Sequence, residues 1–201
     1  MKKLGLFLIL VLGLVSFCFA SESILLDDYE IAVTGGPDGT VDFGAGNGSS
    51  VNVTSATDTK TWNNMSLKVT FDAVAGGYIY IARGSELTAK NAAWDVKPES
   101  IDWKKYDAIS FYMYGTDSKT KVAVDVKDSG NELWRFIVED NFKGWKQIIC
   151  PFAEFFARND WQPDAADKNS VMDFPLKSYQ YEPLPVAKGT LYFDKVELIK
   201  K

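Results

Sequence analysis

The sequence contains no histidine, and this is its most restrictive absence. Serine and cysteine triads of the usual type need a histidine as their base, and many zinc sites need histidine ligands. Both kinds of active site are therefore excluded, together with any acid–base step that relies on an imidazole.

Positive charge and cysteine are also scarce. Lys and Arg number 22 against 27 Asp and Glu, so the formal net charge is −5 at pH 7. Because nucleic-acid binding needs a basic surface, this balance argues against a nucleic-acid partner, and also against adsorption to an anionic membrane. Of the two cysteines, only Cys150 lies outside the N-terminal leader described next. Its apolar surroundings predict an inert, buried thiol without a disulfide.

Long apolar runs are missing except at the N-terminus. Lys2 and Lys3 precede an apolar run from Leu4 to Val15, which is shorter than the roughly 20 residues that a membrane-spanning helix needs. Small residues suited to signal-peptidase cleavage end at Ala20. We therefore expect residues 1–20 to be a cleaved signal peptide. We expect residues 21–201 to form a single exported domain, secreted or periplasmic, without a membrane span.

Short segments of alternating character dominate the rest of the chain. Val122, Val124 and Val126, for example, alternate with Lys121 and Asp125 around them. Such alternation is typical of antiparallel strands with one buried face. Strands are predicted at 24–33, 39–43, 50–54, 67–71, 77–83, 109–113, 122–126, 132–138, 145–150, 176–182 and 190–199. One helical turn is expected at 151–157, and the whole pattern predicts an all-β sandwich of the jelly-roll type.

Aromatic residues are abundant, at 14% of the chain, and some form pairs two positions apart on predicted strands. Tyr78 with Tyr80, and Tyr179 with Tyr181, therefore point to one face within each pair. The intervening residues are apolar or neutral and do not decide which face that is. An exposed ring can stack on the C–H face of a pyranose at low entropic cost, whereas a buried ring fills the sandwich core.

Polar groups suited to sugar hydroxyls lie together near position 160. Arg158 and Asp160 flank Trp161 within one predicted loop. A glycosidase would instead need two acids about 5–10 Å apart in a cleft. Asp160 and Asp164 are two such acids, but among 27 acids a neighbouring pair arises by chance and no motif isolates it. The sequence therefore predicts no catalytic residue and favours binding over hydrolysis.

Seven segments, taken together in their order and spacing, are similar to one known group of proteins. They are Leu25–Glu30, Ser66–Thr70, Gly76–Tyr78, Asp102–Phe111, Trp145–Phe155, Asp160–Pro163 and Gly189–Leu198. They resemble the family 11 carbohydrate-binding modules and the related complex I intermediate-associated protein family, which are galactose-binding-like jelly rolls. The resemblance covers nearly all of the chain after the leader.

The resemblance implies a non-catalytic module that binds a polysaccharide, a β-glucan above all, in an aromatic-lined cleft. It places Tyr78, Arg158, Trp161 and Tyr181 at positions that contact the glucan. Together with the aromatic pairs and Asp160, the predicted ligand-binding set is Tyr78, Tyr80, Arg158, Asp160, Trp161, Tyr179 and Tyr181. Because the same fold also serves structural and assembly proteins, the alternative is a cell-envelope protein that binds a partner protein and no sugar.

The resemblance also implies a structural calcium ion that clamps the terminal strands. Calcium takes about six to eight oxygen ligands, typically carboxylates and backbone carbonyls. The first and last strands of a jelly roll lie side by side, so Asp28 and Glu30 near the first can converge with Asp194 on the last. We therefore expect calcium at Asp28, Glu30 and Asp194; the alternative is that these are ordinary solvated acids.

Overall fold

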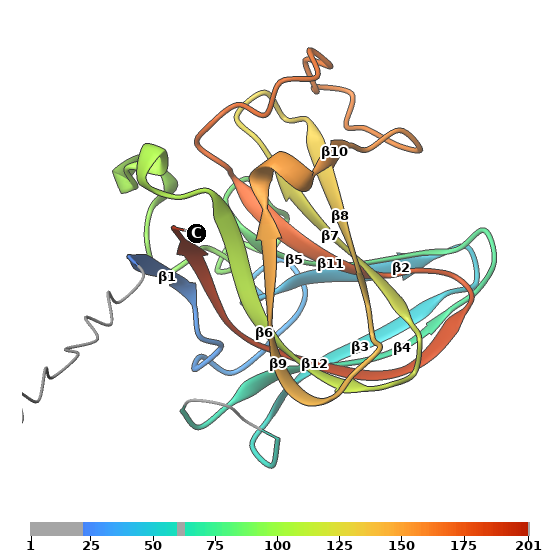
Figure 1. Cartoon of the computed structure of the whole chain (residues 1–201). Helices are drawn as coiled ribbons and strands as arrows, with labels where there is room; N and C mark the ends of the chain where they lie inside the picture. The colour runs from blue at the N-terminus through green and yellow to red at the C-terminus, as the bar shows by residue number, and fades with distance from the viewer. Residues whose placement is uncertain (1–21, 60–62, 201) are drawn as a thin grey trace, which may run out of the picture.

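The computed structural model describes residues 22–59 and 63–200, which form two antiparallel sheets (Figure 1). Sheet A has the order β3–β4–β12–β6–β9 with β1 paired to β12, and sheet B has the order β10–β8–β7–β11–β5–β2. The strands of sheet A are β1 (Ser23–Asp27), β3 (Ser50–Ala56), β4 (Ser66–Ala73), β6 (Ala108–Thr116), β9 (Lys143–Pro151) and β12 (Ala187–Ile199). Those of sheet B are β2 (Asp42–Gly46), β5 (Tyr78–Gly84), β7 (Lys121–Lys127), β8 (Leu133–Glu139), β10 (Phe156–Ala157) and β11 (Ser178–Pro183). The predicted all-β sandwich is confirmed.

Three predicted elements differ from the structure. The strand predicted at 39–43 begins later and runs from Asp42 to Gly46 as β2. The first strand ends at Asp27 instead of continuing to 33, because Tyr29 takes a left-handed backbone conformation with φ of 55°. Within the predicted helical turn at 151–157, Phe152–Glu154 forms a single 3₁₀ turn, and Phe156–Ala157 pairs with β8 as β10. Two more 3₁₀ turns, η1 (Pro98–Ser100) and η2 (Trp103–Lys105), lie in the connection from β5 to β6.

The core lies between the two sheets and is built from the apolar face of each alternating strand. The ring of Tyr181 on β11 stacks on Phe193 of β12 with centroids 4.0 Å apart. It also meets Phe111 of β6 edge-on at 5.1 Å. Cys150 is buried in the same cluster, so the predicted burial of this thiol is confirmed, and burial raises its pKa.

A buried ion pair ties the first strand to sheet B. Arg83 follows Ile79 and Ile81 on the inner face of β5, so its charge needs a partner inside the protein. Asp27 at the end of β1 provides this partner, and the hydroxyl of Tyr179 donates to Asp27 at 3.0 Å. β1 in turn lies beside the C-terminal end of β12 (Figure 1). The side chains on the inner face of β5 thus stabilise the fold, and those on its outer face are left to contact other molecules.

Within residues 22–59 and 63–200, no helix is both long enough and apolar enough to cross a membrane. The predicted signal peptide at 1–20 lies outside the described residues.

Candidate functional site

A cleft of about 800 Å³ lies over the outer face of sheet B. It is lined by β2, β5 and β11 and by the loop that follows β10. Successive residues of a strand point to opposite faces. Because Ile79 and Ile81 are buried in the core, Tyr78 and Tyr80 point outward into the cleft. By the same alternation, Glu182 of β11 lines the cleft while Tyr181 is buried in the core.

Exposed aromatic rings stand at two sides of this cleft. Tyr78 on β5 is 48% exposed, and Trp161 in the loop after β10 is 56% exposed. Tyr80 is half-buried beside Asp42, and burial together with that carboxylate raises the pKa of its hydroxyl. Large aromatic side chains that remain open to solvent within a concave site are suited to stacking on a ligand.

The loop that carries Trp161 is fastened to the edge of sheet B. After β10 pairs with β8, the backbone amide of Arg158 donates to the carbonyl of Leu133 at 2.8 Å. The side chain of Gln162 then accepts from the amide of Leu133 at 2.7 Å and donates to the carbonyls of Leu133 and Arg158 at 2.9 and 2.8 Å. Trp161 is thereby presented on a backbone with fixed hydrogen bonds, although its ring is exposed.

An ion-pair network of two arginines and three carboxylates extends from one side of the cleft toward the neighbouring strands β7 and β8. Arg135 of β8 binds Asp125 of β7 with two hydrogen bonds of 2.7 and 2.8 Å, and it also reaches Glu182. Arg158 lies 3.2 Å from Asp125 and 3.1 Å from Glu182. It makes a second bidentate pair with Asp160, at 2.8 and 3.0 Å. Planar, bidentate pairs of this kind fix side-chain geometry as well as charge.

Hydrogen bonds and burial set the protonation state of each group in this network. The hydrogen bonds from Arg158 lower the pKa of Asp160, whereas burial raises the pKa of Glu182. Burial alone would lower the pKa of Arg135, but its hydrogen bonds and proximity to Asp125 raise it. Both arginines therefore stay charged, and the network supplies donors and acceptors together.

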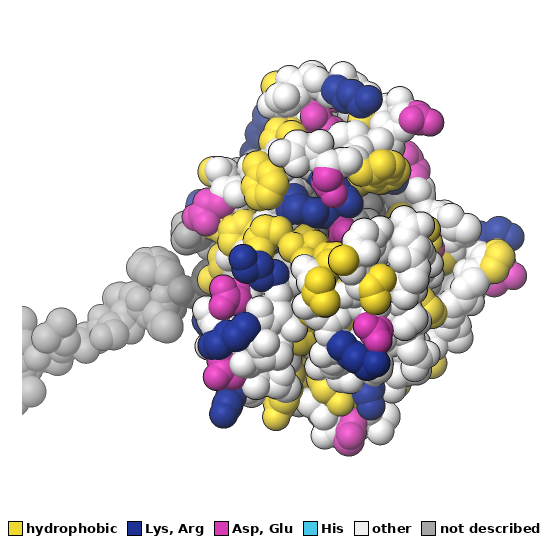
Figure 2. All heavy atoms as spheres, turned by 90° about the vertical axis from the view of Figure 1, so that its right-hand side faces the viewer, with side chains coloured by type: hydrophobic (Ala, Val, Ile, Leu, Met, Phe, Trp, Pro, Cys, Tyr) yellow, Lys and Arg dark blue, Asp and Glu magenta, His cyan; other side chains and the backbone are white. Residues whose placement is uncertain are grey.

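The guanidinium of Arg158 also lies 5.7 Å from the centroid of the Trp161 ring. This cation–π contact holds the charged group against the aromatic wall. The cleft can thus stack on an apolar face of a ligand and hydrogen-bond to hydroxyl groups at the same time. Over the face shown in Figure 2, basic side chains lie among acidic ones, which does not resemble a surface for nucleic acid.

Five of the seven predicted ligand residues come together in this cleft: Tyr78, Tyr80, Arg158, Asp160 and Trp161. The prediction for Tyr179 and Tyr181 is wrong, because each side chain is 1% exposed and lies in the core. Their register against β5 turns both rings toward the opposite sheet.

The sequence reasoning missed several polar residues of the cleft and of the network. They are Asp42, Asp125, Arg135, Gln180 and Glu182. A signal was present for Asp125, since it alternates with the valines of β7 and must face away from the core. No comparable signal joined it to Arg135 or Glu182, which come from other strands.

The three predicted calcium ligands do not converge in the described part of the chain. Glu30 accepts hydrogen bonds from the backbone amides of Asn64 and Met65 at 2.8 and 2.9 Å. Asp194 is buried, and it accepts from the amide of Lys195 at 2.7 Å.

Asp28 instead lies with Asp27 and Asp95, whose oxygens come within 4.8 Å of one another. Asp27 in that group is already neutralised by Arg83, so the cluster does not fit a calcium ion well. Calcium binding itself stays a prediction, which thermal melts with and without EDTA would test.

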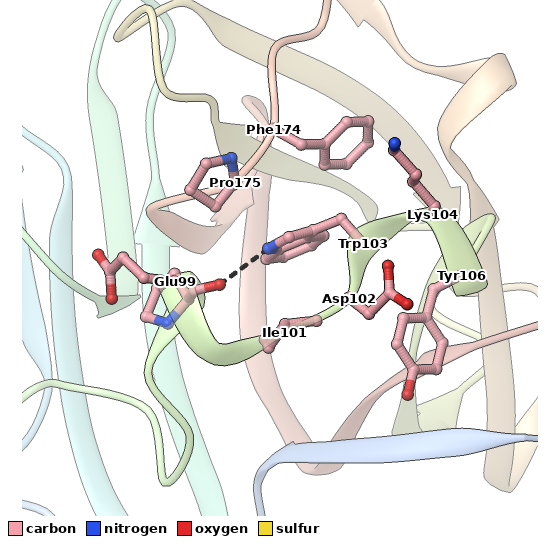
Figure 3. Close-up of a pocket in the computed structure, with 9 residues that line it drawn as sticks. Glu99, Ile101, Asp102, Trp103, Lys104, Tyr106, Phe174 and Pro175 are labelled. Carbon is pink, nitrogen blue, oxygen red and sulfur yellow. Dashed lines mark hydrogen bonds between the residues drawn. The ribbon is translucent and has the colours of Figure 1, made fainter.

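A second hollow of about 580 Å³ lies beside η2 and has a different character (Figure 3). Trp103 faces Phe174 there with ring centroids 5.3 Å apart, and its indole N–H donates to the carbonyl of Pro98 at 2.9 Å. The ring is only 9% exposed. Because its face and its polar group are both engaged within the protein, we place the functional site in the cleft over sheet B.

Comparison with known families decides what kind of site this is. A family described as carbohydrate binding domain (family 11) matches residues 18–201. The chain belongs to this family. Family 11 domains bind carbohydrate and are not catalytic, so the prediction of a non-catalytic carbohydrate-binding module is confirmed.

Solved structures of family 11 modules have the same fold. The module of the cellulosomal cellulase Lic26A-Cel5E of Clostridium thermocellum is 20% identical with a TM-score of 0.69, covering 91% of this chain and 97% of that one. A family 11 module from the same organism, in complex with a β-1,3-1,4-mixed-linked tetrasaccharide, is 22% identical with a TM-score of 0.68, covering 90% and 97%. A search of curated protein sequences finds no significant match.

Proposed function

We propose that the cleft over sheet B binds a β-glucan-like polysaccharide chain. The observation that carries this proposal is that Tyr78 and Trp161 present exposed rings within one cleft that also holds the charged groups of Arg158, Asp160 and Glu182. The similar module bound to a mixed-linked tetrasaccharide supports this ligand class.

The aromatic side chains supply the stacking surfaces. Each aromatic stack contributes on the order of 1 kcal/mol beyond the burial of its area. A short oligosaccharide that covers one ring should therefore bind weakly, and longer chains that reach both Tyr78 and Trp161 should bind more tightly. Because the ligand is neutral, the dissociation constant should change little with ionic strength.

The ion-pair network supplies hydrogen-bonding groups that orient the sugar in the cleft. Asp160 is 56% exposed at its side chain and accepts two hydrogen bonds from Arg158, so its remaining lone pairs can accept from sugar hydroxyls. Gln180 lines the cleft and donates to Asp125 at 3.2 Å, which leaves its carbonyl oxygen to accept from a hydroxyl. Groups that are fixed before binding lose little entropy when the sugar arrives.

We further propose that the domain works outside the cytoplasm, in the periplasm or beyond the cell. The charged and apolar character of residues 1–20 supports export. The mass of the protein recovered from a host with a general secretion pathway would test this. A mature N-terminus at Ser21 agrees with the proposal, and an intact N-terminus contradicts it.

Affinity gel electrophoresis tests the ligand. We expect retarded migration in gels that contain mixed-linked β-glucan, with weaker or no retardation in xylan and mannan. Trp161→Ala should be retarded clearly less than the wild type because it lacks one stacking ring, while Trp145→Ala, which removes the same residue type from sheet A, should be retarded like the wild type. Free migration of the wild type in all three polysaccharides would overturn the proposal.

The alternative, a structural or assembly protein of the cell envelope, predicts a different result. It requires a folded wild-type protein that binds none of the polysaccharides and that retains a defined protein from an envelope extract. Membership in a carbohydrate-binding family and the position of the exposed rings favour the sugar.

A further inference from the structure

Two glycines on the edge strand of sheet B lie directly opposite the cleft tyrosines. In the antiparallel register of β2 and β5, Gly46 pairs with Tyr78 and Gly44 pairs with Tyr80. A Cβ atom added to Gly46 would lie 2.5 Å from Cε1 and Cζ of Tyr78, and one added to Gly44 would lie 2.9 Å from Cε1 of Tyr80. The outer end of each tyrosine therefore occupies the space where a side chain on β2 would begin.

The backbone does not require glycine at either position. Neither Gly44 nor Gly46 has the positive φ that other residues avoid, in contrast to Gly48 at 90° in the next turn. Glycine weakens a strand interior, and its presence there often marks the close approach of another group. Here the groups that approach the glycines are the side chains of Tyr78 and Tyr80.

The glycines also change the direction of the tyrosines. Side chains on a strand usually stand roughly perpendicular to the sheet, supported by their cross-strand neighbours. Tyr78 and Tyr80 instead extend over the backbone of β2, because no side chain on Gly44 or Gly46 blocks them. At the next outward position of β2, Asp42 carries a side chain, and its partner on β5 is the small residue Ala82.

We propose that Gly44 and Gly46 are positioning residues of the binding cleft. Their missing side chains let Tyr78 and Tyr80 lie over β2 as one low platform with two rings, which supports consecutive sugar units of a polysaccharide chain. A larger residue at either glycine would lift the neighbouring ring and narrow the cleft. This inference rests on the proposed function and adds that two residues without side chains on β2 set the direction of its tyrosine rings.

The ring placement can be tested without sugar. A proton close to an aromatic ring shows a ring-current shift, so the Hα resonances of Gly46 should be displaced from ordinary glycine values in the wild type. Replacement of Tyr78 by Leu should return them to ordinary values. Unshifted Gly46 Hα resonances in the wild type would overturn the inference.

A double-mutant cycle tests the role in binding. We expect Gly46→Ala to weaken binding of a β-1,3-1,4-linked hexasaccharide about as much as Tyr78→Ala does, roughly tenfold each. In the Tyr78→Ala background, Gly46→Ala should change affinity less than about twofold, because the ring it displaces is already absent. Full affinity of Gly46→Ala, or losses that multiply in the double variant, would overturn the inference.

The matched control is Gly189→Ala on sheet A. A Cβ atom at Gly189 would meet the Phe71 ring at 3.7 Å, an ordinary contact, so affinity should not change. Thermal melts of every variant separate unfolding from loss of binding. A hexasaccharide that binds the wild type as weakly as a single glucose overturns the platform. No binding of any β-glucan by the wild type overturns the proposed function and this inference together, whereas a selective failure of the Gly46→Ala test overturns the inference alone.

Discussion

Two pairs of tyrosines with the same spacing lie on neighbouring strands and point in opposite directions. Tyr78 and Tyr80 on β5 face the cleft, whereas Tyr179 and Tyr181 on β11 lie in the core at 1% exposure each. The strands pair directly, with Tyr181 opposite Ile81. A shift of one residue in a strand exchanges its two faces, so register alone separates a pair suited to ligand from a pair needed for folding.

The two pairs also differ in what surrounds them. The inner pair contacts groups from other strands, since Tyr181 stacks on Phe193 and Tyr179 donates to Asp27. The outer pair lies over glycines and next to open space. Removal of an inner ring should therefore appear in the free energy of unfolding, and removal of an outer ring in the free energy of binding.

The largest expected difference is in stability after removal of a whole ring. Tyr181→Ala should lower the free energy of unfolding by about 3–5 kcal/mol, because it leaves a cavity between Phe111 and Phe193. Tyr78→Ala should change it by no more than about 1 kcal/mol, because the site is exposed. Urea denaturation measures both. Equal losses in the two variants would contradict the distinction between inner and outer pairs.

Removal of a single hydroxyl group tests the same difference in stability between the inner and outer pairs. Tyr179→Phe should cost about 1–3 kcal/mol of unfolding free energy, since Asp27 loses a donor at 3.0 Å inside the protein. Tyr80→Phe, which removes a hydroxyl from the outer pair, should cost less than about 0.5 kcal/mol. Chemical denaturation of both variants provides the measurement, and a neutral Tyr179→Phe would show that Arg83 and the backbone amide of Tyr29 satisfy Asp27 without the hydroxyl.

Affinity should depend on the two pairs in the opposite way: substitutions in the outer pair should change it more than substitutions in the inner pair. Tyr78→Phe should keep its affinity for β-glucan oligosaccharides because it keeps the ring, and Tyr78→Ala should lose roughly tenfold, or about 1.4 kcal/mol. Tyr179→Phe, tested at a temperature where it remains folded, should bind like the wild type. Isothermal titration calorimetry gives these values, and a large loss in Tyr179→Phe would assign the inner pair a part in binding.

The smallest expected effect is that of pH on the cleft. With no histidine in the chain, the dissociation constant should be nearly constant between about pH 6 and 8. Burial raises the pKa of Glu182 and Arg158 lowers that of Asp160, so Glu182 takes up its proton first as the pH falls. Affinity should then decline moderately as the pH falls through the raised pKa of Glu182, because the protonated group stops attracting the two arginines.

The two carboxyl groups act on stability with opposite signs. Asp160 has a depressed pKa in the folded state, so its stabilising contribution is present above its unfolded pKa and disappears as the pH falls through the lower folded value. Glu182 has a raised pKa, so its protonation favours the folded state. Titrations and melts from pH 4 to 8 follow both quantities, and a tenfold change in affinity between pH 6 and 8 would contradict the assignment.

The limits of the sequence reasoning follow from particular residues. Alternation around Val122–Val126 correctly indicated a strand, because that signal is contained within seven neighbouring residues of β7. The strand is buried on both faces and not on one, since Ala123 and Asp125 are as buried as the valines. The loop with Arg158, Asp160 and Trp161 was found because its functional groups are neighbours in the chain. The first strand was drawn too long because the turn at Tyr29 depends on contacts with Tyr179 and Asp27, which sequence alone does not display.

The amino-acid sequence by itself determined the all-β class, most of the strands, the lack of histidine chemistry and five residues of the cleft. The tertiary structure decided which tyrosine pair faces the cleft, which carboxylates meet Arg135 and Arg158, and which residues of β2 lie opposite Tyr78 and Tyr80. The physical reason is that alternation is a property of one strand, whereas register, ion pairing and ring placement are properties of two or more strands that are far apart in the chain.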